Sequence, residues 1–236
     1  MTDPYPQARA ARATEAQVDQ GLRSYMLRVY NYMTSGLAIT GLVSYVVAQS
    51  GLAQVIWGTP IAWVLLFSPM ILMLFMGRGI QRVKPGTAQA LFWGFSAFMG
   101  LWLSYIFLAY TATSIVRVFF IAAAMFGAMS LYGYTTKRSL AGWRSFLMMG
   151  MIGVLIGVLI NIFLLQSTML DFVVSGVAVI LFAGLTAYDT QRIKQAYVES
   201  DGEAALCKKA ILGALLLYFN FIGLFVWLLH LFGGRN

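Results

Sequence analysis

The feature that most constrains this chain is a succession of long apolar stretches, each close to the length that crosses a bilayer. A hydrocarbon core of about 30 Å needs about 20 apolar residues in a helix, and a helix satisfies its own backbone hydrogen bonds in lipid. Seven such stretches follow one another: 29–49, 56–76, 88–110, 116–134, 146–165, 172–188 and 210–232. The sequence therefore predicts an all-α integral membrane protein with seven transmembrane helices.

Composition agrees with this reading and excludes several classes of protein. Hydrophobic residues make up 60% of the chain and charged residues 10%, against roughly 45–50% and 25% in soluble domains. A soluble enzyme, a disordered chain and a disulfide scaffold are therefore excluded. The single cysteine, Cys207, and the single histidine, His230, cannot supply a usual zinc ligand set. We expect no cofactor.

The basic residues indicate how the chain is oriented. All but two of the sixteen lysines and arginines fall in segments on one side of the predicted membrane, and only Arg117 and Arg235 fall on the other. The positive-inside rule then places the amino terminus in the cytoplasm and the carboxyl terminus outside. The net charge of +8 is thus a topology signal at the lipid surface, and we expect no nucleic acid partner.

The chain divides into a short tail and one membrane domain. Residues 1–28 are polar and carry mixed charge, so we expect a cytoplasmic tail that is partly disordered. Residues 29–236 form the seven-span transmembrane domain. The polar length before residue 29 is typical of a mature helix that follows a tail, and not of a cleaved signal peptide.

Ionisable residues within membrane spans are costly, so each is a candidate functional residue. Asp189 closes the sixth stretch. It can pair with Arg192 at the interface, or lie below the headgroups if the helix continues through Ile193, because a stretch that ends at residue 188 is short for a span. Asn220 lies near the middle of the last stretch and needs a hydrogen-bond partner. We expect Asp189 to be that partner.

The other polar candidates have simpler explanations. Asp171, His230 and Arg117 lie near the predicted outer surface, where interfacial positions are tolerated. Asn161 is expected to bond a neighbouring helix. No paired acids and no Ser/His arrangement accompany Asp189, so an intramembrane protease is not favoured, and we expect no enzyme activity.

Two motifs give the chain a family resemblance. Residues 187–194 read Ala-Tyr-Asp-Thr-Gln-Arg-Ile-Lys, and residues 217–225 follow about thirty positions later, before an ending rich in leucine at 228–233. The chain resembles the Bax inhibitor-1 family of seven-span membrane proteins over nearly its whole length after the tail. The resemblance implies that six helices surround a central carboxyl-terminal helix in a bacterial inner (cytoplasmic) membrane.

The resemblance also implies a gate. In the family, acids from the sixth and seventh helices close a pore near the cytoplasmic side, and an arginine near the end of the second helix engages them. Asp189 matches the sixth-helix acid, but Asn220 stands at the position of the seventh-helix acid. Arg78 is the best match to the arginine, with Arg82 close behind.

The implied function is a pH-modulated calcium (cation) leak channel, with calcium and protons as the permeant ions. Asp189 would contact calcium only weakly, because calcium prefers six to eight oxygen ligands. Two neighbouring carboxylates titrate as a coupled unit, so an Asp facing an Asn predicts weaker or shifted proton sensitivity. The alternative is a non-conducting membrane regulator of stress, cell death or membrane-protein quality control that acts through membrane-protein partners in the lipid bilayer.

Overall fold

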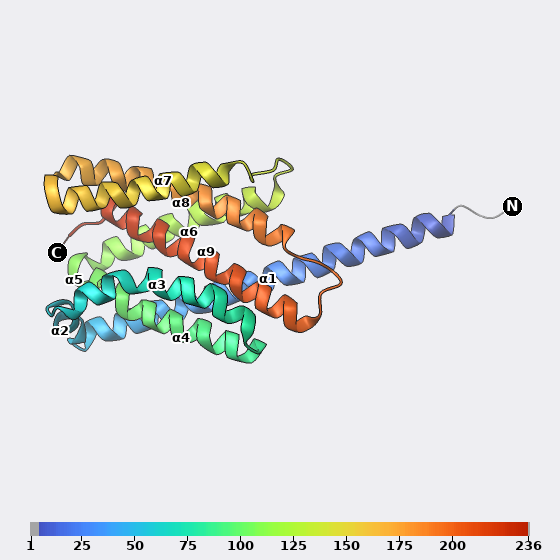
Figure 1. Ribbon diagram of the computed structural model, residues 1–236, viewed down its shortest axis with the longest axis horizontal. Coiled ribbons are helices and arrows are strands. Elements are labelled where there is room, and N and C mark those ends of the chain that lie inside the picture. The colour runs from blue at the N-terminus through green and yellow to red at the C-terminus, as the bar shows by residue number, and fades with distance from the viewer. Residues whose placement is uncertain (1–4, 236) are drawn as a thin grey trace.

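The computed structural model describes the backbone of residues 5–235, and the side chains of that range apart from residues 5–18 and positions 61, 63, 66, 67, 70 and 74. Helices follow one another with short connections (Figure 1). They are α1 (Tyr5–Gln49), α2 (Leu52–Trp57), α3 (Ile61–Arg82), α4 (Pro85–Leu103), α5 (Tyr105–Ala109), α6 (Ala112–Thr135), α7 (Trp143–Ile160), the π-helical η1 (Asn161–Leu165), α8 (Thr168–Gln195) and α9 (Glu203–Phe232). The all-helical class predicted from the sequence is confirmed for this part of the chain.

Five segments among the described residues have the length and apolar composition of a membrane span. They are Pro85–Ala109, Ala112–Thr135, Trp143–Leu165, Thr168–Gln195 and Glu203–Phe232. They correspond to the last five predicted stretches. Helices α1 and α3 coincide with the first two, so the count of seven stays a prediction beyond these five.

Helix α1 begins at Tyr5 and continues without interruption through the first predicted span. Its amino-terminal part extends beyond the other helices (Figure 1). Residues 1–4 of the predicted tail, and residue 236 of the predicted membrane domain, lie outside the described residues. The division of the chain at residue 28 stays a prediction, because the helix crosses it.

The second predicted span begins too early, and local backbone chemistry explains why. The chain first forms the short helix α2, which Gly58 caps at its carboxyl end, and Pro60 then precedes α3. Proline suits a helix start because its ring fixes φ and the missing N–H has no intrahelical acceptor there. The apolar run from residue 56 is therefore divided between two helices.

The sixth predicted span ends too early because the helix continues beyond the apolar stretch into polar residues. Helix α8 has 28 residues and continues past Asp189 and Ile193 to Gln195. The expectation that the helix extends through Ile193 is confirmed. Asp189 is consequently a residue of the helix body and not of the following loop.

Helix α9 lies at the centre of the bundle. It packs against α1, α3, α4, α6 and α8, and in Figure 1 it crosses between the group of α6, α7 and α8 and the group of α3 and α4. Leu217, Tyr218, Leu224 and Leu229 are among its almost fully buried side chains. Helix α7 packs mainly on α8 and lies at the periphery, and the expected arrangement of six helices around a central carboxyl-terminal helix stays a prediction.

The connections α3 to α4, α6 to α7 and α8 to α9 share one end of the bundle (Figure 1). We call it the basic end, since it carries every lysine and arginine except Arg117 and Arg235 among the described residues. The Nζ of Lys208 donates to the carbonyl oxygen of Gln81 at 3.1 Å, which joins α9 to the end of α3. The cytoplasmic location of this end stays a prediction.

Helices α6 and α8 approach each other closely beside the 187–194 segment. A Cβ atom added at Gly133 of α6 would overlap the carbonyl group of Ala187 in α8. Small residues at such crossings let two membrane helices bring their backbones together, which increases van der Waals contact in lipid. Gly133 therefore sets the distance between α6 and the polar segment of α8.

We predict that Gly133→Ala destabilises the bundle by about 1–3 kcal/mol, because the new methyl group meets backbone and α8 must shift. Thermal unfolding in detergent should show a lower midpoint. Gly127→Ala on the same helix is the matched control, since a Cβ there meets nothing within 4 Å. Equal midpoints for the two variants would contradict the close approach of α6 and α8.

Candidate functional site

The polar residues of the 187–194 segment lie in the last two turns of α8 and are mostly buried. Asp189, Thr190 and Gln191 expose 6%, 0% and 7% of their surfaces. Buried polar groups are costly unless they are hydrogen-bonded. Each of the three has a partner on a different part of the chain, so the segment connects α8 to its neighbours.

Asp189 contacts the central helix. The Nδ2 of Asn220 donates a hydrogen bond to the Oδ2 of Asp189 at 2.7 Å, and Asn220 is itself only 5% exposed. A hydrogen bond to a charged acceptor is shorter and stronger than a neutral one. The contact expected from the sequence between these two residues is present in the structure.

Thr190 begins a chain of hydroxyl groups that crosses three helices. Its Oγ1 lies 3.1 Å from the Oγ of Ser130 in α6, and that oxygen lies 2.6 Å from the hydroxyl of Tyr30 in α1. Each hydroxyl can donate and accept, so the three can form a continuous hydrogen-bonded chain. Sequence reasoning missed Ser130 and Tyr30 because only the fold brings α1 and α6 beside Thr190.

Gln191 and Lys194 hold the connection between α6 and α7. The Oε1 of Gln191 accepts from the Leu140 N–H at 2.8 Å, and its Nε2 donates to the Arg138 carbonyl oxygen at 2.8 Å. The Nζ of Lys194 donates to the Tyr134 carbonyl oxygen at 2.9 Å and lies over the Tyr134 ring. The signal for these roles was the run of polar residues that continues after Asp189.

The structure does not bring Arg78 or Arg82 to the acid. Both are exposed residues of α3, which packs on α4 and α9. Among the described residues, the ion pairs join Arg28 to Glu203 and Lys209 to Asp201. Arg192, three residues after Asp189, is exposed and likewise forms no ion pair with it in this part of the chain.

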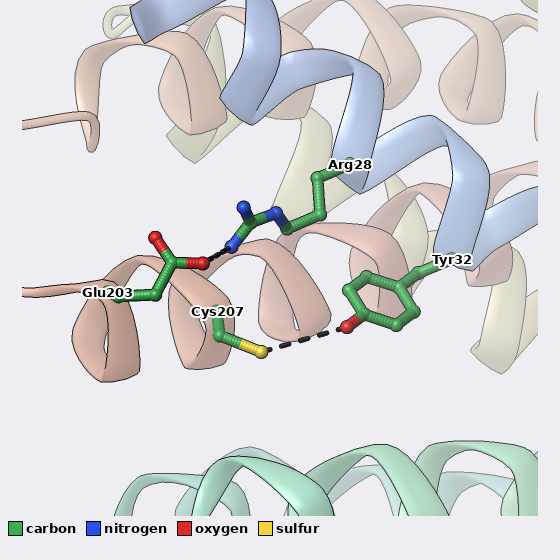
Figure 2. Close-up of polar contacts among 4 residues, drawn as sticks. All are labelled: Arg28, Tyr32, Glu203 and Cys207. Atoms are coloured by element: carbon green, nitrogen blue, oxygen red, sulfur yellow. Dashed lines mark hydrogen bonds and ion pairs between the residues drawn. The ribbon is translucent and has the colours of Figure 1, made fainter.

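Helix α1 is fastened to the start of α9 at the basic end (Figure 2). The Nη1 of Arg28 donates to the Oε1 of Glu203 at 2.5 Å, and the hydroxyl of Tyr32 lies 3.6 Å from the Sγ of Cys207. One turn earlier, the rings of Tyr25 and Tyr197 are 5.6 Å apart. Burial, and then the nearby Asp201, raise the pKa of Tyr25 to about 12, so its hydroxyl stays neutral at physiological pH.

The remaining polar candidates lie toward the opposite end of the bundle. The Oδ1 of Asn161 accepts from the Ser167 N–H at 2.8 Å, which supports the turn between η1 and α8. The Nδ1 of His230 lies 2.9 Å from the Val226 carbonyl oxygen of its own helix. Asp171 is partly buried, and Arg117 is exposed. The structure joins none of these four to Asp189 within its described residues.

The donors near Asp189 are few for a metal site. No group of three or more His, Cys, Asp or Glu side chains gathers anywhere in the described part of the chain. Asp189 offers one carboxylate, with the Asn220 amide beside it. Calcium ions are held by six to eight oxygens in stable sites, which is more than these two side chains supply.

Comparison with known proteins identifies relatives along nearly the whole chain. Residues 22–236 match the family described as "Inhibitor of apoptosis-promoting Bax1". The chain is 43% identical to the inner membrane protein YbhL of Escherichia coli K12, over 92% of this chain and 94% of that protein. It is 42% identical to a protein of Caulobacter vibrioides, over 98% and 97% of the two chains. A Rickettsia prowazekii protein is 41% identical over 92% of each.

We predict that Gln191→Ala loosens the connection between α6 and α7, because two buried hydrogen bonds are lost at about 1 kcal/mol each. Hydrogen exchange of the Leu140 amide should become faster, while exchange within α9 stays unchanged. Gln195→Ala is the control, since Gln195 is exposed at the end of the same helix. Unchanged exchange at Leu140 would show that Gln191 does not hold this connection.

Proposed function

Because this chain belongs to the Bax inhibitor-1 family of membrane proteins, we propose that it is a pH-modulated calcium leak channel gated by Asp189 and Asn220. The gate lies toward the basic end, where α8 meets the central helix. The family membership gives the protein class. The leak, the permeant ion and the gate are our proposal, argued below from the contacts of the two residues.

One observation carries the proposal: an ionisable side chain is buried within a membrane helix and meets the central helix through a single amide. Asp189 is 6% exposed, and Asn220 donates to it at 2.7 Å. An ionisable group inside a membrane is expensive to maintain and marks an ion pathway in many transporters and channels. A carboxylate that served only to join two helices could be replaced by a second amide at lower cost.

The weakness of the cation site favours conduction. A leak requires that an ion bind well enough to enter and weakly enough to leave. Asp189 supplies one full charge, and the nearby hydroxyl groups of Thr190 and Ser130 contact each other between α8 and α6. Together they offer fewer ligands than a stable calcium site requires.

Proton sensitivity follows from the partner of the acid. When two carboxylates face each other, one proton is shared and the pair titrates as a unit. In this chain the second group is an amide, which has no proton to lose in the physiological range. We therefore propose that the leak responds to pH through a single carboxylate and less steeply than in relatives with an acid pair.

Closure of the gate is assigned to Asn220 in this proposal. Arg78 and Arg82 lie exposed on α3. The donor that contacts the Asp189 carboxylate is the Asn220 amide and not an arginine. An arginine would engage Asp189 only in a second state in which α3 has moved, and that role also remains part of the proposal.

The proposed location is a bacterial inner membrane. The relative from Escherichia coli is named an inner membrane protein, and the basic end faces the cytoplasm under the positive-inside rule. This orientation puts the amino terminus inside and the carboxyl terminus outside. It also puts the Asp189–Asn220 contact nearer the cytoplasmic surface.

The second candidate is a regulator that acts through protein partners without carrying ions. It is favoured by the position of α7, which packs mainly on α8 and exposes large apolar side chains such as Phe146, Met149 and Ile152. Such a face can contact a partner helix as well as lipid. Ion flux measurements separate the two candidates.

We predict that Asp189→Asn lowers calcium entry into proteoliposomes by about tenfold, because the charge that attracts the cation is lost while the side-chain shape is kept. The remaining flux should no longer depend on pH between 5 and 8. Glu199→Gln, an exposed loop carboxylate, is the control and should leave flux unchanged. If neither the unmodified protein nor the variant carries calcium, the regulator becomes the better account.

We predict that Asn220→Asp steepens the pH dependence of the leak, because it places a second carboxylate beside Asp189 and couples their titrations. Calcium flux measured across a series of pH values should change over a narrower range than in the unmodified protein. Asn161→Asp, at the opposite end of the bundle, tests whether any new carboxylate has this effect. An unchanged pH profile for Asn220→Asp would contradict the assignment of the gate.

A further inference from the structure

Two hollows lie one after the other between α1 and α6. The first has a volume of about 580 Å³ and is the nearer of the two to the basic end. Arg23 and Tyr30 of α1, and Phe126, Ser130 and Tyr134 of α6, are among its lining residues. We call it the inner groove. Its basic residue and its hydroxyl groups make it the more polar of the two hollows.

Hydroxyl groups connect the wall of the inner groove to α8. The Tyr30 hydroxyl bonds the Ser130 hydroxyl, which in turn bonds Thr190. Thr190 directly follows Asp189 in α8. The hydroxyl chain of the inner groove therefore ends one residue along α8 from the acid of the proposed gate.

The second hollow is smaller and almost wholly apolar. It has a volume of about 110 Å³ and lies farther along the same helices, toward the opposite end of the bundle. Phe119, Phe221 and Phe225 line it together with aliphatic side chains, and Thr40 and Ser44 are its polar lining residues. We call it the dry cavity. Water is disfavoured in such an apolar hollow because a water molecule finds too few polar partners there.

An aromatic contact separates the two hollows. Phe126 lines the inner groove, Phe221 lines the dry cavity, and their ring centroids are 5.6 Å apart in an edge-to-face arrangement. The two side chains are 6% and 4% exposed. Phe119 contacts Phe221 from the side of the dry cavity, also at 5.6 Å. The rings come from α6 and from the central helix α9, so a small displacement between those helices would part them.

We propose that the ion path runs between α1 and α6, and that Phe126 and Phe221 form a hydrophobic constriction which closes it between the inner groove and the dry cavity. The proposal rests on the leak function proposed above and adds its route and a second barrier. A hydrated cation cannot cross an apolar constriction while water is excluded from it, so such a constriction gates by dewetting. Asn220 precedes Phe221 in α9, so movement at the acid contact reaches the constriction through one helix.

The first test measures calcium entry into proteoliposomes for Phe126→Ala and Phe221→Ala. Each variant removes one ring and lets water join the two hollows, so the leak should increase about tenfold. Phe120→Ala is the matched control, because Phe120 is on α6 but is 67% exposed on its outer face. Phe221→Tyr keeps the packing volume and adds a hydroxyl group, so it should also increase the leak. It serves as the test if an alanine variant fails to fold.

The second test reads hydration without relying on ion flux. Ser44→Cys places a thiol in the dry cavity, and Cys207→Ser removes the native thiol. A charged, membrane-impermeant thiol reagent should label this protein slowly. When Phe126→Ala or Phe221→Ala is added, labelling should be at least about tenfold faster, because water then reaches the cavity. Phe120→Ala should leave the labelling rate unchanged.

The outcomes distinguish this proposal from the leak function. Faster labelling together with a larger leak supports both. If the unmodified protein leaks calcium but the ring variants change neither the leak nor the labelling, the constriction is overturned and the leak function stands. If no variant carries calcium while the ring variants label faster, the constriction is supported as a water barrier and the calcium leak is overturned.

Discussion

The hydrogen bond between Asp189 and Asn220 is the interaction on which the rest of the structure depends. A carboxylate buried inside a helix bundle is unstable unless a donor faces it. That requirement brings the last two turns of α8 against the middle of α9 at 2.7 Å. The central position of α9 in turn keeps the donor and the acid away from lipid.

The residues that follow Asp189 connect the same part of α8 to further segments of the chain. Thr190, Gln191 and Lys194 each bond a different partner, on α6 or on the connection between α6 and α7. Gly133 permits the close approach that these bonds need. The polar residues after Asp189 thus have a mainly structural role, and in our proposal Asp189 is the member of the segment whose charge serves function.

The aromatic side chains between α6 and α9, in contrast to the polar segment of α8, exclude water. Phe126, Phe221 and Phe119 contact one another between α6 and α9, where the polar wall of the inner groove ends. In our proposal, a path that is polar at one end and apolar in its middle stays closed without an ion pair. This agrees with the absence of an ion pair at Asp189 among the described residues.

The sequence by itself determined the helical class and the asymmetry of basic residues and predicted Asn220 as a partner of Asp189, because each follows from the cost of placing polar groups in lipid. It located Arg78 and Arg82 near the end of a helix but could not place them relative to the acid. Only the tertiary structure decided that both are exposed, that α7 is peripheral, and that Tyr30 and Ser130 join Thr190. These depend on contacts between distant segments, which apolar periodicity does not encode.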